Sequence, residues 1–188
     1  MLTLSLSIFS QKEEQEDFKT ILGERGTNGG YGGFSFGYAS IAGSDAAIFG
    51  GQGAWILNHY LSIGIAGSGF ATDFKSDTTN LVGGYGGLLL EPIILPLFPV
   101  HLSLPILLGA GGIAKTKTYY YSNNSYVVDS DPFFFVRPGA EIELNLTRHM
   151  RLALGAYYMY TSRLTVLGIS KTALNNFSGA VTLKFGKF

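Results

Sequence analysis

The sequence has no cysteine and few charged residues. In the 188-residue chain, charged residues make up 14%, whereas they average about 25% in soluble domains. The absence of cysteine excludes disulfide bonds and thiolate metal sites within this sequence. The low charge indicates a chain with too few charged side chains to cover an ordinary water-exposed surface.

The chain also lacks an excess of either charge. Thirteen basic and thirteen acidic residues cancel, so no net positive field attracts a polyanion. We therefore expect no nucleic-acid partner. What the chain does have is apolar bulk, since hydrophobic residues make up 46% of it and aromatic residues 14%.

Composition divides the chain into three parts. Residues 1–11 are apolar and serine-rich and precede the charged run "KEEQEDFK", which predicts the end of a secretory signal cleaved near Gln11 or Lys12. This segment lacks the basic residues that open such signals, so an ordinary strand is the alternative. Residues 12–28 read as a polar leader with one short helix over 14–22, and residues 29–188 as one β domain.

The β domain shows apolar and polar residues in strict alternation. In "FFFVRPGAEIELNL" the apolar Val136 and Ile142 fall on one face and Arg137, Glu141 and Glu143 on the other, which is typical of strands with one apolar face. The same pattern, separated by turn residues, predicts eight strands at about 29–43, 46–57, 60–74, 81–91, 100–117, 133–146, 151–164 and 177–188.

Two architectures fit eight alternating strands: a soluble lipocalin-like barrel or sandwich, and a membrane barrel with its apolar face outward. Strands of about 12 residues exceed the 9–11 needed to cross a bilayer, and long connections alternate with shorter ones. We therefore predict an all-β, eight-stranded antiparallel up-and-down transmembrane β-barrel in the outer membrane of a Gram-negative bacterium, in contact with its lipid. A membrane helix within 81–112 is disfavoured because Pro92, Pro96, Pro99 and Pro105 would break it.

Aromatic residues gather near the two ends of the expected strands. Two such girdles are what the interfaces of a bilayer select. The expected belt consists of Trp55, Tyr60 and Phe185 at one end and Tyr119, Tyr120, Tyr158 and Tyr160 at the other. The closing Phe188 resembles the carboxy-terminal aromatic of bacterial outer-membrane barrels, but it is out of phase with Phe185, which predicts a bulge or a frayed end.

The polar faces of the strands carry charge that is expected inside the barrel. An eight-stranded barrel is just wide enough for side chains to fill it, so these residues are expected to pair across strands and plug it, with a narrow conduit for small solutes as the alternative. The expected lumenal residues are Arg137, Glu141, Glu143, Arg151, Arg163, Lys115 and Lys184.

We expect no catalytic activity, cofactor or metal site. His59, His101 and His149 map to the same end of the expected barrel, where we interpret them as polar turn residues and expect no acid beside them with metal-ligand spacing. A hydrolase would need a base near a nucleophile, and serines at the other end lie about a membrane thickness away from these histidines.

Two surfaces are candidates for a partner. The turn "PIILPLFP" at 92–99 is unusually apolar, and either lipid or a protein would cover its side chains Ile93, Ile94, Leu95, Leu97 and Phe98. The loop at 118–131 is rich in tyrosine, serine and asparagine, a composition found in adaptable recognition surfaces. An aromatic girdle that continues past the membrane explains the same composition.

Several glycine-rich motifs resemble a known family. "GGYGG" at Gly29, "GGQGAWILNHYLSIGIAGSGF" from Gly50, "GGYGGLLLEPI" from Gly83 and "LLGAGGIA" from Leu107 resemble an uncharacterised family of small predicted outer-membrane β-barrels from Bacteroidetes-type bacteria. Gln52 stands where that family often has arginine. The resemblance implies a fold and a location, and it carries no established activity.

Overall fold

The computed structural model describes residues 28–72, 79–118, 125–166 and 170–188. In this part of the chain, strands account for nearly all regular structure, and no helix has the length and apolar character to cross a bilayer. The expected signal segment, leader and short helix lie outside the described residues.

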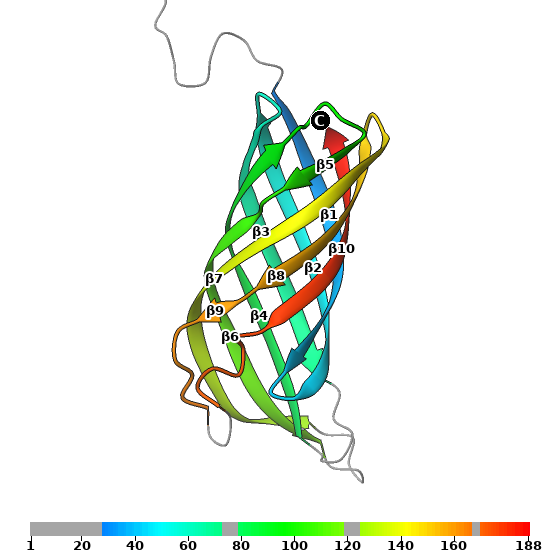
Figure 1. The fold of residues 1–188 in the computed structure, drawn as a ribbon. Helices are drawn as coiled ribbons and strands as arrows, with labels where there is room; N and C mark the ends of the chain where they lie inside the picture. The colour runs from blue at the N-terminus through cyan, green and yellow to red at the C-terminus, as the bar shows by residue number, and fades with distance from the viewer. Residues whose placement is uncertain (1–27, 73–78, 119–124, 167–169) are drawn as a thin grey trace, which may run out of the picture.

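The described strands follow one another along the chain in antiparallel order (Figure 1). They are β1 (Gly29–Ile41), β2 (Ser44–Leu57), β3 (Leu61–Thr72), β4 (Thr79–Ile94), β5 (Val100–Ser103), β6 (Ile106–Thr118), β7 (Ser125–Thr147), β8 (Met150–Tyr158), β9 (Tyr160–Thr161) and β10 (Phe177–Lys187).

The sheet closes on itself because β1 pairs with both β2 and β10. Two positions in the ring are built from broken strands: β5 and β6 both pair with β4 and β7, and β8 and β9 both pair with β7. The break between β5 and β6 falls at Pro105, which has no N–H to donate to a ladder. The described strands therefore form a ring of eight, and the predicted antiparallel up-and-down barrel is confirmed.

Tight turns connect strands at both ends. We call the end at which β1 begins and β10 finishes the upper end, as drawn in Figure 1, and the other the lower end. The β2–β3 turn at the upper end has positive φ at Asn58 (50°) and His59 (66°), as a hairpin turn matching the twist of its strands requires. At the lower end, Ala42 and Gly43 have φ of 51° and 80°, so the β1–β2 turn begins before the end of the strand predicted over 29–43.

Two connections differ from expectation. The loop expected over 118–131 is mostly strand, because residues 125–131 belong to β7 and pair with β6, with a register shift between Lys115 and Thr116. The turn expected over 92–99 is shorter, since β4 continues to Ile94 and pairs there with β5. Residues 119–124 of the loop predicted at 118–131 lie outside the described part, so its role as a recognition surface stays a prediction.

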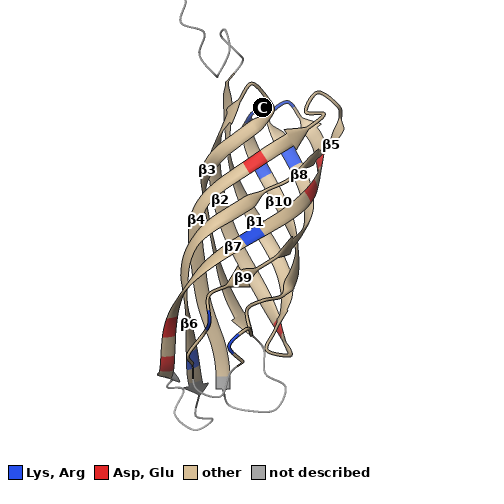
Figure 2. Ribbon diagram, turned by 60° about the vertical axis from the view of Figure 1, so that its left-hand side comes forward, with Lys and Arg blue, Asp and Glu red and all other residues tan. Residues whose placement is uncertain are grey.

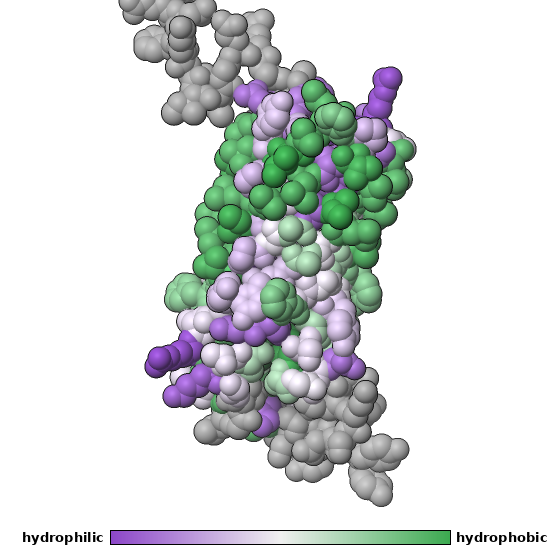
Figure 3. Space-filling view, viewed as in Figure 1, coloured by the Kyte–Doolittle hydropathy of each residue, from purple (hydrophilic) through white to green (hydrophobic). Residues whose placement is uncertain are grey.

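The outward face of the barrel is apolar. Phe34, Phe49, Ile65 and Phe134 are each 65–75% exposed, and residues 46–72, which form most of β2 and β3, contain no charged residue. Figure 2 shows that charged residues occupy few places along the strands. Figure 3 shows a green apolar band around the upper part of the face in view. A surface of this kind is expected where strands meet lipid.

The interior has two unlike halves. Its upper half holds polar and charged side chains, which we call the upper network: Tyr31, Glu91, His101, Ser103, Glu141, Glu143, Arg151 and Lys184. Its lower half holds apolar side chains, which we call the lower cluster: Ala39, Ile41, Ala46, Ile48, Phe70, Leu81, Tyr85, Leu89, Leu107, Ile113, Phe133, Phe135, Met159, Leu164, Val166, Ala173 and Leu174.

Glycine permits close strand contact between β4 and β6. Gly87 lies opposite Gly109, and a Cβ on either residue would lie 2.0–2.1 Å from a backbone carbonyl oxygen of the facing strand. No side chain larger than hydrogen fits there without moving the backbone. The close approach of β4 and β6 at this pair therefore requires glycine.

Candidate functional site

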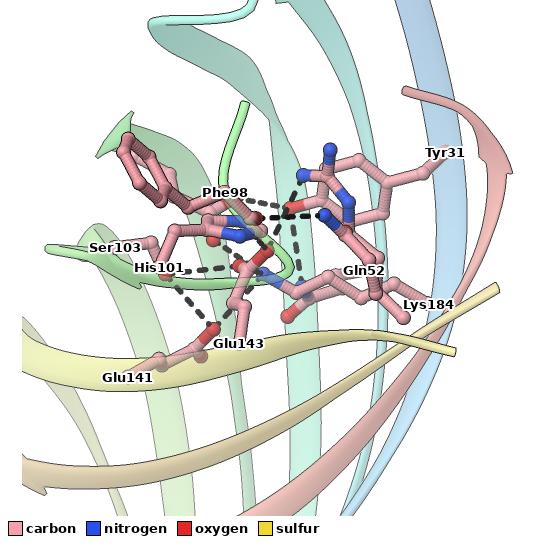
Figure 4. A network of polar contacts seen from close by, with 11 residues as sticks. Tyr31, Gln52, Phe98, His101, Ser103, Glu141, Glu143 and Lys184 are labelled. Atoms are coloured by element: carbon pink, nitrogen blue, oxygen red, sulfur yellow. Dashed lines mark hydrogen bonds and ion pairs between the residues drawn. The ribbon is translucent and has the colours of Figure 1, made fainter. Parts of the chain in front are cut away.

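Lys184 lies at the centre of the upper network and is 1% exposed. Its ammonium group donates to Glu91, to Glu141 at 2.9 Å and to Glu143 at 2.5 Å. These carboxylates come from β4 and β7, whereas Lys184 comes from β10, so the lysine crosses the lumen to reach them (Figure 4). One cation therefore ties three strands together inside the barrel.

Glu143 has further partners on two neighbouring strands. His101 Nε2 lies 2.9 Å from Glu143 Oε2, and the Arg151 guanidinium lies 3.4 Å from the same oxygen. Ser103 donates to Glu143 Oε1 at 3.0 Å. A buried carboxylate is tolerated only when cations and hydrogen-bond donors surround it, and Glu143 has both.

Two tyrosines close the network at its upper and lower limits. Tyr31 donates to Glu91 and accepts a hydrogen bond from Gln52 Nε2 at 3.2 Å. Tyr157 donates to Glu141. Figure 4 shows the labelled side chains of Tyr31, Lys184 and Glu143 converging from different strands. Each of the three central carboxylates thus has bonds from more than one element.

The register of the sheet explains why these residues meet. His101 lies directly opposite Glu143 on β5 and β7, and Lys184 lies opposite Arg151 on β10 and β8. Residues opposite each other in a ladder share a face and lie close enough to interact. Alternation along β5 places His101 and Ser103 on the face opposite Leu102, so the sequence pattern already contained the signal for their inward position.

The seven lumenal residues predicted from the sequence are not all brought together. Glu141, Glu143, Arg151 and Lys184 lie in the upper network. Arg137 lies below it, with its guanidinium 3.8 Å from the centre of the Tyr157 ring and donating to Ser178 at 3.3 Å.

The other two predicted residues lie apart from the network. Lys115 is half-buried on β6, close to the lower end. Arg163 is exposed in the segment that follows β9, because that segment leaves the sheet and the alternation of β8 no longer applies there. The structure thus places Arg163 outside the interior for which it was predicted.

Sequence reasoning missed Tyr31, Glu91 and His101 as members of the network. Glu91 was placed at the end of a strand, whereas β4 continues beyond it and turns its side chain inward, where it is 1% exposed. The interpretation of His101 as a polar turn residue is wrong, because it lies within β5 and is 3% exposed. His59 and His149 do lie in turns at the upper end.

An acid does lie beside one histidine, because Glu143 is the partner of His101 across the β5–β7 ladder. Carboxylate oxygens of Glu91, Glu141 and Glu143 lie within 4.8 Å of one another, and His101 contacts the last of them. Oxygen and imidazole ligands of this kind suit a divalent cation. The Lys184 ammonium stands between the carboxylates, so the geometry is that of an ion-pair network with its cation supplied by the chain.

A small cavity separates the network from the apolar half. It has a volume of about 30 Å³ and is lined by polar groups that include Gln52, Ser68, Arg137 and Thr182. This is room for one or two water molecules. The described interior there offers no volume for a ligand of the size that lipocalins bind.

The segment between β9 and β10 covers the lower cluster. Leu164 and Leu174 are each 1–2% exposed and pack with Phe133 and Phe135. Hydrogen bonds to β7 hold this segment in place, with Ser162 N–H donating to Phe134 O at 2.9 Å and Thr165 N–H to an Asp131 carboxylate oxygen at 2.6 Å. The lower half of the lumen is thereby filled as a protein core is filled.

Aromatic side chains lie near both ends of the outward face. Trp55, Tyr60 and Phe185 are 45–62% exposed at the upper end, and Tyr160 is 55% exposed toward the lower end. Tyr158 is half-buried and packs against Tyr160 and Phe177. Tyr119 and Tyr120, predicted in the same belt, lie outside the described residues.

Phe188 turns into the barrel, and no bulge is needed to place it. β10 pairs with β1 up to Lys187 without a shift in register. The Phe188 ring stacks on Tyr31 with centroids 6.0 Å apart, and Arg151 lies 4.0 Å from its centre. The expected bulge or frayed end is therefore wrong, since strict alternation carries this side chain to the inner face.

The candidate partner surface on the β4–β5 turn keeps four of its five residues. Ile94, Leu95, Leu97 and Phe98 are 43–79% exposed. Ile93 is 5% exposed and packs inside with Tyr31 and Ile56. Ile93 does not belong to this surface, because β4 continues through it and alternation turns it inward.

Comparison with known proteins finds similarity of fold. Neisserial surface protein A matches 86% of this chain and 97% of its own, at 15% identity and a TM-score of 0.56. The amino-terminal β-barrel domain of OprF from Pseudomonas aeruginosa matches 86% of this chain and 98% of its own length, at 11% identity and a TM-score of 0.49. Ail from Yersinia pestis matches 85% of this chain and 95% of its own length, at 17% identity and a TM-score of 0.45.

These similar structures are small outer-membrane barrels of eight strands. At such identities the likeness concerns the fold alone. No family model matches the sequence, and no curated protein matches it.

Proposed function

We propose that this protein is a closed barrel of the Gram-negative outer membrane with a structural or accessory role, without catalytic activity, that presents its lower-end loops to the outside. The observation that carries the proposal is the sorting of residues between the two faces. Lys184 and its carboxylates lie inside at 1–2% exposure, while Phe34 and Phe134 are each 75% exposed outside. Large apolar side chains at this exposure would be costly in water and are favoured in lipid.

The filled interior supports a structural role over the two alternatives. A soluble lipocalin-like binder requires a hollow apolar interior, and here side chains fill the lower half. A small-solute channel requires a continuous path, and the upper network spans the lumen from β10 to β4 and β7. The motifs that resemble Bacteroidetes-type barrels support the same location.

The proposed orientation puts the upper end in the periplasm. The turns at Asn58 and at Thr147–Met150 are short there, as periplasmic turns of outer-membrane barrels are. The proposed interfacial belt then has Trp55, Tyr60 and Phe185 at the periplasmic boundary and Tyr158 and Tyr160 toward the outer one. Tyr119 and Tyr120, proposed for the same belt, are outside the described residues.

Cell fractionation with a heat-shift gel tests the proposal. The chain is exported from a known signal, and boiled and unboiled outer-membrane samples are compared by electrophoresis. We expect recovery in the outer-membrane fraction and faster migration of the unboiled form, because a closed barrel stays compact in detergent. Soluble recovery without a heat shift would contradict the proposal.

Planar bilayer recording separates the structural role from the channel. The purified barrel is expected to give no steady conductance, because the upper network and the lower cluster block the lumen. Steady, ion-dependent currents would favour the narrow channel instead.

A further inference from the structure

We propose that the β4–β5 turn, residues 94–100, is a membrane anchor that inserts into the lipid interface at the upper end of the barrel. This inference rests on the proposed function, since it assumes that the outward face meets lipid. It identifies the partner of an exposed apolar surface as the phospholipid leaflet and not as a protein.

The turn carries apolar side chains that point away from the barrel. Leu95, Leu97 and Phe98 are 60%, 79% and 58% exposed, and Val100 is 53% exposed. Residues 92–100 contain no charged residue. Side chains of this kind, presented without charge, are suited to the boundary between headgroups and acyl chains.

Several backbone polar groups of the turn are either absent or bonded within the protein. Pro92, Pro96 and Pro99 have no N–H. The Phe98 N–H donates to Leu95 O at 3.1 Å, and Phe98 O accepts from Asn145 Nδ2 at 3.1 Å. A segment that enters lipid must satisfy its backbone within the protein, and these groups of the turn are satisfied in that way.

Contacts to neighbouring strands fix the turn in place. Pro99 O accepts from the Asn145 N–H at 2.9 Å, and Pro92 O accepts from the Leu104 N–H at 2.9 Å. Pro96 is buried against the barrel. The exposed side chains are thus held outward by a backbone that is bonded to Asn145 of β7, and do not result from a loose loop.

The turn is continuous with the apolar outward face. Ile94 and Leu102 pair across β4 and β5 and are 43% and 36% exposed on that face. Tyr60, a member of the proposed belt, is joined to the turn because its carbonyl accepts from the Ile93 N–H at 2.7 Å. The lipid that covers these strands therefore extends directly to the turn.

The other two turns at the upper end are different. The β2–β3 turn contains the half-buried Asn58 and His59, and the β7–β8 turn contains Arg148 and His149, which are exposed. Polar turns of this kind suit the water beyond the headgroups. The contrast indicates that only one of the three described upper turns is built for lipid.

Tryptophan quenching by lipid tests the inference. Trp55 is the only tryptophan in the chain, so Trp55→Phe with Phe98→Trp gives a probe in the turn, and Trp55→Phe with His149→Trp gives a matched probe in a polar turn. Each full-length variant is folded into phosphatidylethanolamine–phosphatidylglycerol vesicles with and without bromine on the acyl chains near the headgroup. Leu97→Trp replaces Phe98→Trp if the latter loses its heat shift.

The inference predicts that tryptophan at 98 loses emission by the same factor as native Trp55, while tryptophan at 149 keeps its emission. If the probes at 98 and 149 both keep their emission while Trp55 is quenched, the barrel lies in lipid and the proposed anchor is overturned. If both probes are quenched to the same extent, the contrast between the two turns is lost and the proposed anchor is overturned as well. If Trp55 itself is not quenched, the proposed membrane location fails first.

Discussion

The two halves of the barrel interior are filled by different physical means. The upper half is held by ion pairs around Lys184, whose ammonium contacts three carboxylates. The lower half is held by apolar packing around Phe133 and Leu174, each 1–2% exposed. A buried ion network depends on every partner being present, whereas an apolar core depends on volume. The same barrel therefore has one half sensitive to lost charge and another sensitive to lost volume.

Removal of the central cation is expected to have the largest effect. Lys184→Met leaves three buried carboxylates without their shared partner, and we expect a loss of about 3–5 kcal/mol in the free energy of unfolding. Urea unfolding in lipid vesicles, followed by Trp55 emission, measures this loss. Lys187→Met on the same strand is exposed and should change stability by less than about 0.5 kcal/mol.

A second substitution distinguishes charge from volume in the upper half. Adding Glu91→Gln to Lys184→Met removes the charge of a carboxylate whose other partner is the Tyr31 hydroxyl, so the double variant is expected to be more stable than Lys184→Met alone. Additive losses would show that the network acts through packing and not through charge.

Loss of volume in the lower half is expected to have a slightly smaller effect. Leu174→Ala removes a side chain that is 1% exposed in the lower cluster, and we expect a loss of about 2–4 kcal/mol. The same unfolding assay applies. Thr172→Ala, at an exposed position of the same segment, is the control, and equal losses from both would contradict the account of this segment as a filled core.

The close contact between β4 and β6 is expected to tolerate no added methyl group. Gly87→Ala places a Cβ about 2.0 Å from Leu108 O, and the resulting strain should cost about 1–3 kcal/mol. Gly112→Ala is the control, because its nearest atom would be 3.9 Å away. A Gly87→Ala barrel as stable as the control would show that the two strands can separate at no cost.

A loss no larger than that of Gly87→Ala is expected at the edge of the upper network. His101→Phe removes the bond to Glu143 while Lys184 and Arg151 remain, so we expect a loss of about 1–3 kcal/mol. His149→Phe, in an exposed turn, should be nearly neutral. A larger loss from His101→Phe than from Lys184→Met would contradict the central position of the lysine.

Alternation in the sequence was sufficient to predict the fold and the facing of most residues. It placed Glu141, Glu143, Arg151 and Lys184 on inward faces because each lies within a regular strand. It failed for Arg163 because the chain leaves the sheet after β9, and period two holds only where the ladder continues.

The partners within the network could not be predicted in the same way. Glu91 and Lys184 are 93 residues apart, and only closure of the ring brings β4 and β10 to one lumen. His101 was assigned to a turn although the strand predicted over 100–117 already began at Val100, where β5 begins, and alternation along that strand turns His101 away from the face of Leu102. Four members of the lower cluster, Leu164, Val166, Ala173 and Leu174, lie in the β9–β10 segment, and alternation within strands could not predict that this segment packs inward.

Spin-label accessibility along β1 tests the central claim, the opposite facing of apolar and polar residues, most directly. The chain has no cysteine, so single cysteines at positions 34 to 39 can each carry a spin label in folded barrels in lipid. The account predicts high accessibility to lipid-soluble oxygen at Phe34, Phe36 and Tyr38 and low accessibility to oxygen at Ser35 and Ala39. High oxygen accessibility at Ser35 and Ala39 with water-soluble reagent reaching Phe34 and Phe36 would contradict it.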